Sequence, residues 1–110
     1  MPKYAVFFTL TPETIKRMAE NPGDRAAAIR SFVEQEGGRL EGYYWMLGQY
    51  DGMVIVDLPD GKTAATAALT VTSSGAFGRT ETHELFTSEE LAPLLERVRS
   101  AAQRYTPPGR

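Results

Sequence analysis

Residues 39–58 read RLEGYYWMLGQYDGMVIVDL, two runs of aromatic and branched apolar residues separated by a segment with two glycines. Runs of this length and composition are typical of β-strands, and a short glycine-containing segment between them is typical of a hairpin. The stretch therefore predicts a strand over about residues 39–47, a turn at residues 48–52 and a second strand over residues 53–58.

The residues before this hairpin predict one strand and one interrupted helix. Residues 3–10, KYAVFFTL, are short, aromatic and β-branched, as in a strand. Thr11 can cap a helix, and Pro12 suits the first helical position because its missing N–H costs nothing there. The helical pattern pauses at residues 21–23, NPG, and ends at the glycine pair 37–38.

The residues after the hairpin predict a helix, a fourth strand and a last helix. Asp60 can cap a helix that ends at Gly75, and residues 77–86 form the fourth strand. Thr87 to Glu90 match a capping box. The apolar positions beyond it fall on one stripe of a helix: Leu91, Leu94, Leu95, Val98, Ala102 and Tyr105.

This β-α-β-β-α-β order with an additional C-terminal helix predicts an α+β, ferredoxin-like fold. Right-handed crossovers place the first and third strands in the middle of an antiparallel sheet, with helices on one face.

Composition narrows the class of protein. The 110 residues are 42% hydrophobic and 24% charged, which predicts one domain over residues 1–105 and a disordered tail at residues 106–110. A net charge of −2 gives no basic excess for nucleic acid, and the absence of cysteine excludes disulfides and thiolate nucleophiles. The single histidine excludes a multi-histidine metal site within one subunit, and no cofactor is expected. No apolar run approaches the roughly 20 residues of a membrane span, so we expect a cytoplasmic protein.

Alternation along the strands assigns side chains to the two faces of the sheet. The face opposite the helices receives a largely apolar set from the central strands: Ala5, Phe7, Thr9, Met53, Ile55 and Asp57. A soluble monomer rarely exposes such a patch, so we expect this face to pack on another copy of the chain.

The edge strands add polar and aromatic side chains to this face if their alternation is unbroken. Tyr43 and Trp45 are expected there from the second strand, and Arg79, Glu81 and His83 from the fourth. Phe77 and Leu85 share the parity of these charged residues, which argues for the opposite orientation of the fourth strand.

The turn Gly48-Gln49-Tyr50-Asp51, followed by MVIVDLPD, resembles the signature of the GYD domain family of small bacterial and archaeal proteins. The resemblance continues at residues 11–13, 37–41, 74–75 and 85–90, and so extends over nearly the whole chain. It implies a ferredoxin-like domain of the dimeric α/β-barrel type and implies no particular reaction.

The same hairpin is also similar to the effector-binding domains of leucine-responsive (feast/famine) regulators, which assemble through their sheets and bind amino acids near this loop. The chain lacks their DNA-binding helix-turn-helix. The similarity implies a free-standing module for a small apolar or amino-acid-like metabolite, with candidate ligand-binding residues Tyr43, Trp45, Gly48, Tyr50 and Asp51. The residues themselves favour a structural role for Asp51, whose carboxylate can accept backbone N–H bonds in the turn.

Two functions stay open. The favoured one is a homo-oligomeric small-molecule-binding or assembly module without catalysis. The alternative is a small enzyme, as in related dimeric α/β barrels: a monooxygenase or isomerase, either cofactor-independent or haem-dependent, with His83 and Arg79 as catalytic residues. His83 has a side chain suited to general-base catalysis at neutral pH, but that role requires an enclosed cavity around it.

Overall fold

The computed structural model describes residues 1–110 and contains the predicted elements in the predicted order, with the interrupted helix present as two helices. They are β1 (Lys3–Leu10), α1 (Pro12–Glu20), α2 (Arg25–Gln35), β2 (Arg39–Trp45), β3 (Gly52–Asp57), α3 (Gly61–Ser73), β4 (Phe77–Leu85) and α4 (Ser88–Ala102).

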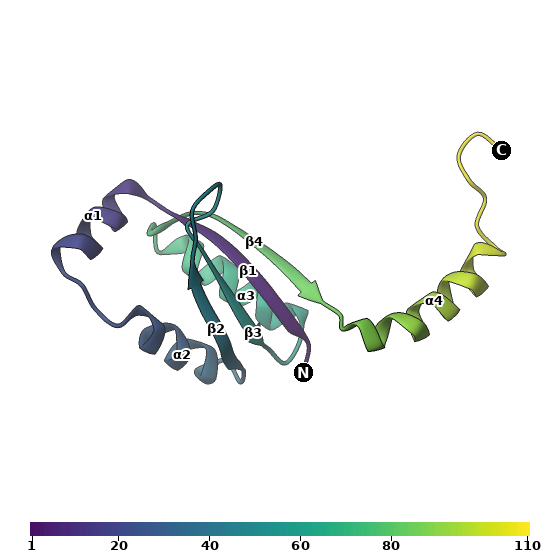
Figure 1. Ribbon diagram of the computed structural model, residues 1–110, viewed down its shortest axis with the longest axis horizontal. Coiled ribbons are helices and arrows are strands. Elements are labelled where there is room, and N and C mark those ends of the chain that lie inside the picture. The colour runs from purple at the N-terminus through teal and green to yellow at the C-terminus, as the bar shows by residue number, and fades with distance from the viewer.

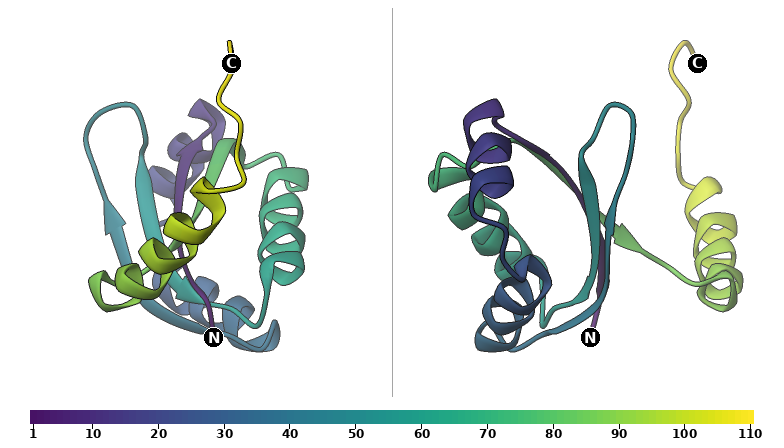
Figure 2. Two further views of the ribbon diagram at one scale, coloured as in Figure 1. Left: turned by 90° about the vertical axis from the view of Figure 1, so that its right-hand side faces the viewer. Right: turned by 60° about the vertical axis from the view of Figure 1, so that its left-hand side comes forward.

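The four strands form one antiparallel sheet in the order β2-β3-β1-β4, which confirms the ferredoxin-like topology (Figure 1). Helices α1, α2 and α3 lie on one side of this sheet, and α4 lies on the other side, away from it (Figure 2). We call the sheet surface opposite α1–α3 the open face.

Each helix begins where the sequence supplies a cap. The Thr11 side chain accepts a hydrogen bond from the backbone N–H of Thr14, and Asp24 and Asp60 cap α2 and α3 in the same way. The predicted capping box of α4 is present between Thr87 and Glu90. Local sequence therefore sets where the helices start.

The core lies between the sheet and the pair α2 and α3. Its buried members come from both layers: Tyr4, Val33, Leu40, Val56, Leu58 and Ala64. Burial of these side chains supplies most of the free energy that holds α2 and α3 on the sheet.

A β-bulge in β2 changes which side chains face the helices. Leu40 pairs with Val56, but the next paired residue is Gly42, opposite Ile55. The extra residue shifts the alternation, so Tyr43 lies on the helix side of the sheet. The prediction that Tyr43 and Trp45 lie on the open face is therefore wrong.

A second bulge resolves the conflict in β4. Thr9 pairs with Arg79, whereas Leu10 pairs with Phe77, so Gly78 is the extra residue. Phe77 consequently lies on the helix side, with its ring centroid 5.4 Å from that of Phe8. The predicted open-face position of the polar residues of β4 is confirmed, and Leu85 lies on that face with them.

Helix α4 extends from the end of β4 and buries none of its residues (Figures 1 and 2). The radius of gyration is 17.8 Å, against about 13 Å expected for a compact chain of this length.

No helix combines the length and the apolar character needed to cross a bilayer.

Candidate functional site

The turn between β2 and β3 is tied to the end of β1 through Asp51. Its carboxylate Oδ2 accepts a 2.7 Å hydrogen bond from the backbone N–H of Leu10, and its own N–H donates to the carbonyl of Phe8 at 2.9 Å. Gly48 adopts a φ of +125° within the turn, a conformation that favours glycine. Asp51 thus has a structural role, as favoured, but it bridges to another strand rather than closing its own turn.

Removal of the Asp51 carboxylate is expected to loosen this connection. Asp51→Ala leaves the Leu10 N–H without its partner and should lower the free energy of unfolding by about 1–2 kcal/mol. Asp51→Asn should cost less than about 0.5 kcal/mol, because an amide oxygen can accept the same bond. Urea unfolding of the two variants measures the difference. Equal losses would mean that the negative charge, and not the hydrogen bond, is what matters.

On the helix side of the sheet, Tyr43 and Trp45 belong to an aromatic cluster around Phe8. The ring centroids of Tyr43 and Trp45 lie 6.0 and 5.7 Å from that of Phe8, in edge-to-face geometry. Phe8 is buried, and its ring lies over Gly52, which has no side chain to obstruct it. The structure thus separates Tyr43 and Trp45 from Tyr50, which lies on the open face.

On the open face, five side chains form what we call the open-face cluster: Phe7, Tyr50, Arg79, Glu81 and His83. The rings of Tyr50 and His83 lie 5.5 and 5.8 Å from that of Phe7. The Arg79 guanidinium lies 5.4 Å from the centre of the Tyr50 ring, a cation–π distance. The strand alternation correctly predicts that Phe7, Arg79, Glu81 and His83 share this face, whereas the position of Tyr50 beside them was not predicted.

A carboxylate holds the polar side chains of this cluster together. Glu81 Oε2 lies 3.0 Å from His83 Nε2, and Glu81 Oε1 lies 3.6 Å from Arg79 Nη2. The hydrogen bond from His83, followed by one from Tyr50, lowers the pKa of Glu81. Desolvation and the hydrogen bond to Glu81 raise the pKa of Tyr50. The cluster is thus a charged, hydrogen-bonded group at one end of the open face.

A second charged group lies at the other end of the open face. Asp57 Oδ1 lies 2.9 Å from Lys3 Nζ, and its Oδ2 lies 3.3 Å from Arg39 Nη2. Lys3 also forms an ion pair with Glu41. The hydrogen bond from Lys3 is the main cause that lowers the pKa of Asp57. The partly exposed apolar centre of the face, formed by Phe7, Met53 and Ile55, thus has charged groups at both ends.

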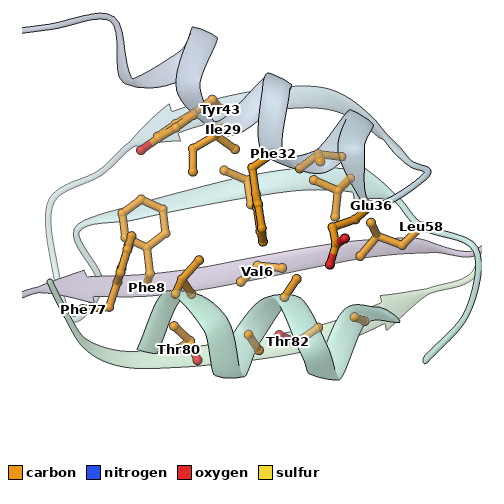
Figure 3. A pocket seen from close by; sticks show the side chains of 17 residues that line it. Val6, Phe8, Ile29, Phe32, Glu36, Tyr43, Leu58, Phe77, Thr80 and Thr82 are labelled. Atoms are coloured by element: carbon orange, nitrogen blue, oxygen red, sulfur yellow. The ribbon is translucent and has the colours of Figure 1, made fainter. Parts of the chain in front are cut away.

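An apolar cavity of about 70 Å³ lies between the sheet and the helices α2 and α3 (Figure 3). Apolar side chains such as Val6 and Phe32 form most of its wall, and Tyr43 lies at one end. Glu36, at the C-terminus of α2, contributes its only ionisable carboxylate. Neither Arg79 nor His83 lines this cavity.

The side chains are not arranged as a metal site, because no three His, Asp or Glu residues gather closely enough to hold an ion. His83 is bonded to one carboxylate, and its side chain is 53% exposed. The open-face cluster can therefore form ion pairs, hydrogen bonds and aromatic contacts with whatever covers the face.

Comparison with known proteins agrees with this architecture. The sequence matches the GYD domain over residues 4–95. The glutamine synthetase and cystathionine beta-lyase binding protein of Thermus thermophilus is 32% identical over 77 residues, which are 69% of this chain and 80% of that protein.

Two solved structures share the fold at low sequence identity. FFRP-DM1 is 14% identical with a TM-score of 0.50, over 78% of this chain and 100% of that one. A hypothetical protein from Pyrococcus horikoshii is 12% identical with a TM-score of 0.50, over 80% of this chain and 93% of that one. Because the family match extends over most of the chain, this protein is a member of the GYD domain family.

Proposed function

We propose that this protein is a homo-oligomeric, protein-binding assembly module without catalytic activity, and that the open face is its assembly surface. The observation that carries the proposal is the apolar centre of that face, which none of the helices α1–α3 covers. Uncovered apolar surface flanked by polar groups is typical of protein interfaces.

The charged groups at the two ends of the open face support this proposal. Asp57 lies between two cations, and Glu81 lies between Arg79 and His83, so both groups already satisfy their charges within one subunit. Paired charges are less costly to bury than isolated ones. A partner can therefore cover the apolar centre without leaving an unpaired charge beneath it.

The relative from Thermus thermophilus is named for binding two enzymes, glutamine synthetase and cystathionine beta-lyase. This supports protein binding, and not catalysis, as the role of the present chain. We propose that, like its relative, the assembled module docks on an enzyme, in the cytoplasm.

Ile55→Glu tests the proposed assembly surface. A carboxylate in the apolar centre cannot be buried without a partner, so the dissociation constant of the oligomer should rise at least about 30-fold. Sedimentation velocity at micromolar concentration measures the change, and circular dichroism checks that the variant is folded.

Leu69→Glu is the matched control, because Leu69 is exposed on α3, on the other side of the sheet, and its substitution should leave the oligomer intact. A monomeric wild-type protein at this concentration would contradict the proposal.

Small-molecule binding has weaker support. The cavity beneath α2 and α3 measures about 70 Å³, far below the roughly 300–1,000 Å³ of typical ligand pockets. Of the predicted ligand-binding residues, Tyr43 lines it. Tyr43 and Trp45 together line a second hollow of about 550 Å³ beside residues 21–26, whereas Gly48, Tyr50 and Asp51 line neither. Binding of a metabolite at these residues stays a prediction.

The enzymatic alternative is favoured by one observation, the carboxylate–imidazole pair of Glu81 and His83, which is the geometry of an oriented general base. The exposure of His83 argues against it, because a base needs a site that excludes water. Haem ligation fits poorly as well, since Glu81 occupies the Nε2 atom through which an imidazole would bind iron.

A further inference from the structure

We propose that α4 is an exchange arm: its apolar stripe docks on the open face of a second copy of the chain, whose own α4 docks in return. The stripe consists of Leu91, Leu94, Leu95 and Val98. This inference rests on the proposed function, because the open face is the assembly surface in both.

Helix α4 is specified by its sequence but has nothing to pack against. The capping box at Thr87 and Glu90 starts it. Yet Leu91, Leu95 and Val98 remain 48%, 55% and 58% exposed. A helix of 15 residues is marginal in water on its own and gains its stability from packing its apolar side. The stripe therefore requires a cover.

The chain itself carries an apolar surface that lacks a cover, the centre of the open face. Further apolar surface lies between this centre and the stripe of α4, because Leu85 at the end of the open face and Phe86 in the junction are both exposed. Half of the large apolar residues that are exposed in the chain lie between Leu85 and Tyr105. Unburied apolar surface is thus concentrated in the arm and at its base.

The junction directs α4 away from the open face of its own subunit. Glu90 Oε1 accepts hydrogen bonds from both the backbone N–H and the Oγ1 of Thr87, at 3.1 Å each. These bonds hold the first turn of α4 against the N-cap, and the helix then projects on the open-face side without touching the sheet (Figure 2). An arm in this position can reach the face of another molecule.

A second copy is the occupant that satisfies both surfaces at once. Two chains related by a twofold axis can exchange arms, so that each face and each stripe is covered by the same contact. A helix of 15 residues is about 22 Å long and 10 Å wide. Two docked arms would bury roughly 900 Å² when both sides are counted, and Leu85 and Phe86 bring this close to the roughly 1,000 Å² of a specific interface.

Cross-linking tests the exchange directly, because the chain contains no cysteine. Isotope-labelled Leu95→Cys protein is mixed with unlabelled His83→Cys protein and treated with a short bis-maleimide. We expect the yield of cross-links between labelled and unlabelled chains to be at least about five times the yield in a control mixture, in which Leu69→Cys replaces Leu95→Cys. Yields equal to the control would overturn the proposal.

The double variant Leu95→Cys/His83→Cys separates exchange from folding back. Exchange predicts covalent dimers, whereas an α4 that folds onto its own sheet gives a cross-link within one chain and a monomer on a denaturing gel. The second result would also overturn the proposal.

A variant of the apolar stripe distinguishes docking of α4 from assembly through the open face without α4. Leu91→Ser/Leu95→Ser/Val98→Ser should raise the dissociation constant of the dimer at least about 30-fold while the sheet stays folded. If Ile55→Glu dissociates the oligomer and the triple serine variant does not, the exchange-arm proposal is wrong and the proposal of assembly through the open face stands. If the wild-type chain is a monomer, both proposals are wrong.

Discussion

Gly52→Ala is expected to lower the free energy of unfolding by about 3 kcal/mol, a large share of the roughly 5–15 kcal/mol that small domains possess. A methyl group at this position would collide with Cζ of Phe8 and would lie 2.9 Å from its Cε2. The Phe8 ring is buried and packs against Tyr43, Trp45 and Phe77, so moving it aside disturbs these aromatic contacts. The glycine that ends the GQYDG turn is thus required by the aromatic cluster beneath it.

A double-mutant cycle tests this explanation. Phe8→Leu shortens the obstructing side chain, so Gly52→Ala should cost at least about 1 kcal/mol less in that background. Gly23→Ala is the control, because nothing lies within 4 Å of a methyl group there, and its stability should stay within about 0.5 kcal/mol of wild type. Identical costs of Gly52→Ala in the two backgrounds would show that the ring is not the obstacle.

Much of the fold could be predicted because its determinants are local. Caps, glycine stops and β-branched runs specify element boundaries within a few neighbouring residues, and the order of elements then restricts the topology. The strand over residues 3–10 and the helix that begins at Pro12 both match the structure.

Alternation alone could not predict which face of the sheet each side chain of the edge strands β2 and β4 lies on. Each bulge inserts one residue and reverses the alternation beyond it. The sequence did carry a signal, since Gly42 and Gly78 each lie within a strand and adjoin a bulge. Glycine inside a strand often marks such a site. Reading these two positions as bulges would have placed Tyr43 and Phe77 on the helix side.

The candidate site depends on contacts between residues distant in sequence. Asp51 was recognisable as a hydrogen-bond acceptor, but its donor, Leu10, lies on another strand. The open-face cluster likewise joins Tyr50 of the turn to Arg79 of β4. The apolar stripe of α4 was recognisable as well, whereas the direction of that helix depends on the three-dimensional junction at Thr87.

Gly38→Ala should also lower the free energy of unfolding by about 3 kcal/mol, because the added methyl group would meet a backbone carbonyl and not only a side chain. Gly38 follows the C-terminus of α2, where its N–H donates to the carbonyl of Val33 at 2.9 Å. A methyl group here would collide with the carbonyl oxygen of Asp57 and would lie 2.8 Å from Cδ2 of the buried Leu58. Because the carbonyl belongs to the sheet, the substitution must displace either β3 or the end of α2.

Gly42→Ala is the matched control. A methyl group there meets the ring of Tyr44, but this side chain is 56% exposed and can move into solvent. The substitution should cost less than about 1 kcal/mol. Urea denaturation of both variants gives the comparison, and sedimentation velocity adds a second readout. Displacement of β3 at Asp57 would disturb its ion pairs with Lys3 and Arg39, so Gly38→Ala should weaken assembly as well as stability. Equal stability of the two variants would mean that the connection between α2 and β2 can shift at little cost. The contact of Gly38 with β3 would then not determine the position of Asp57 at this end of the open face.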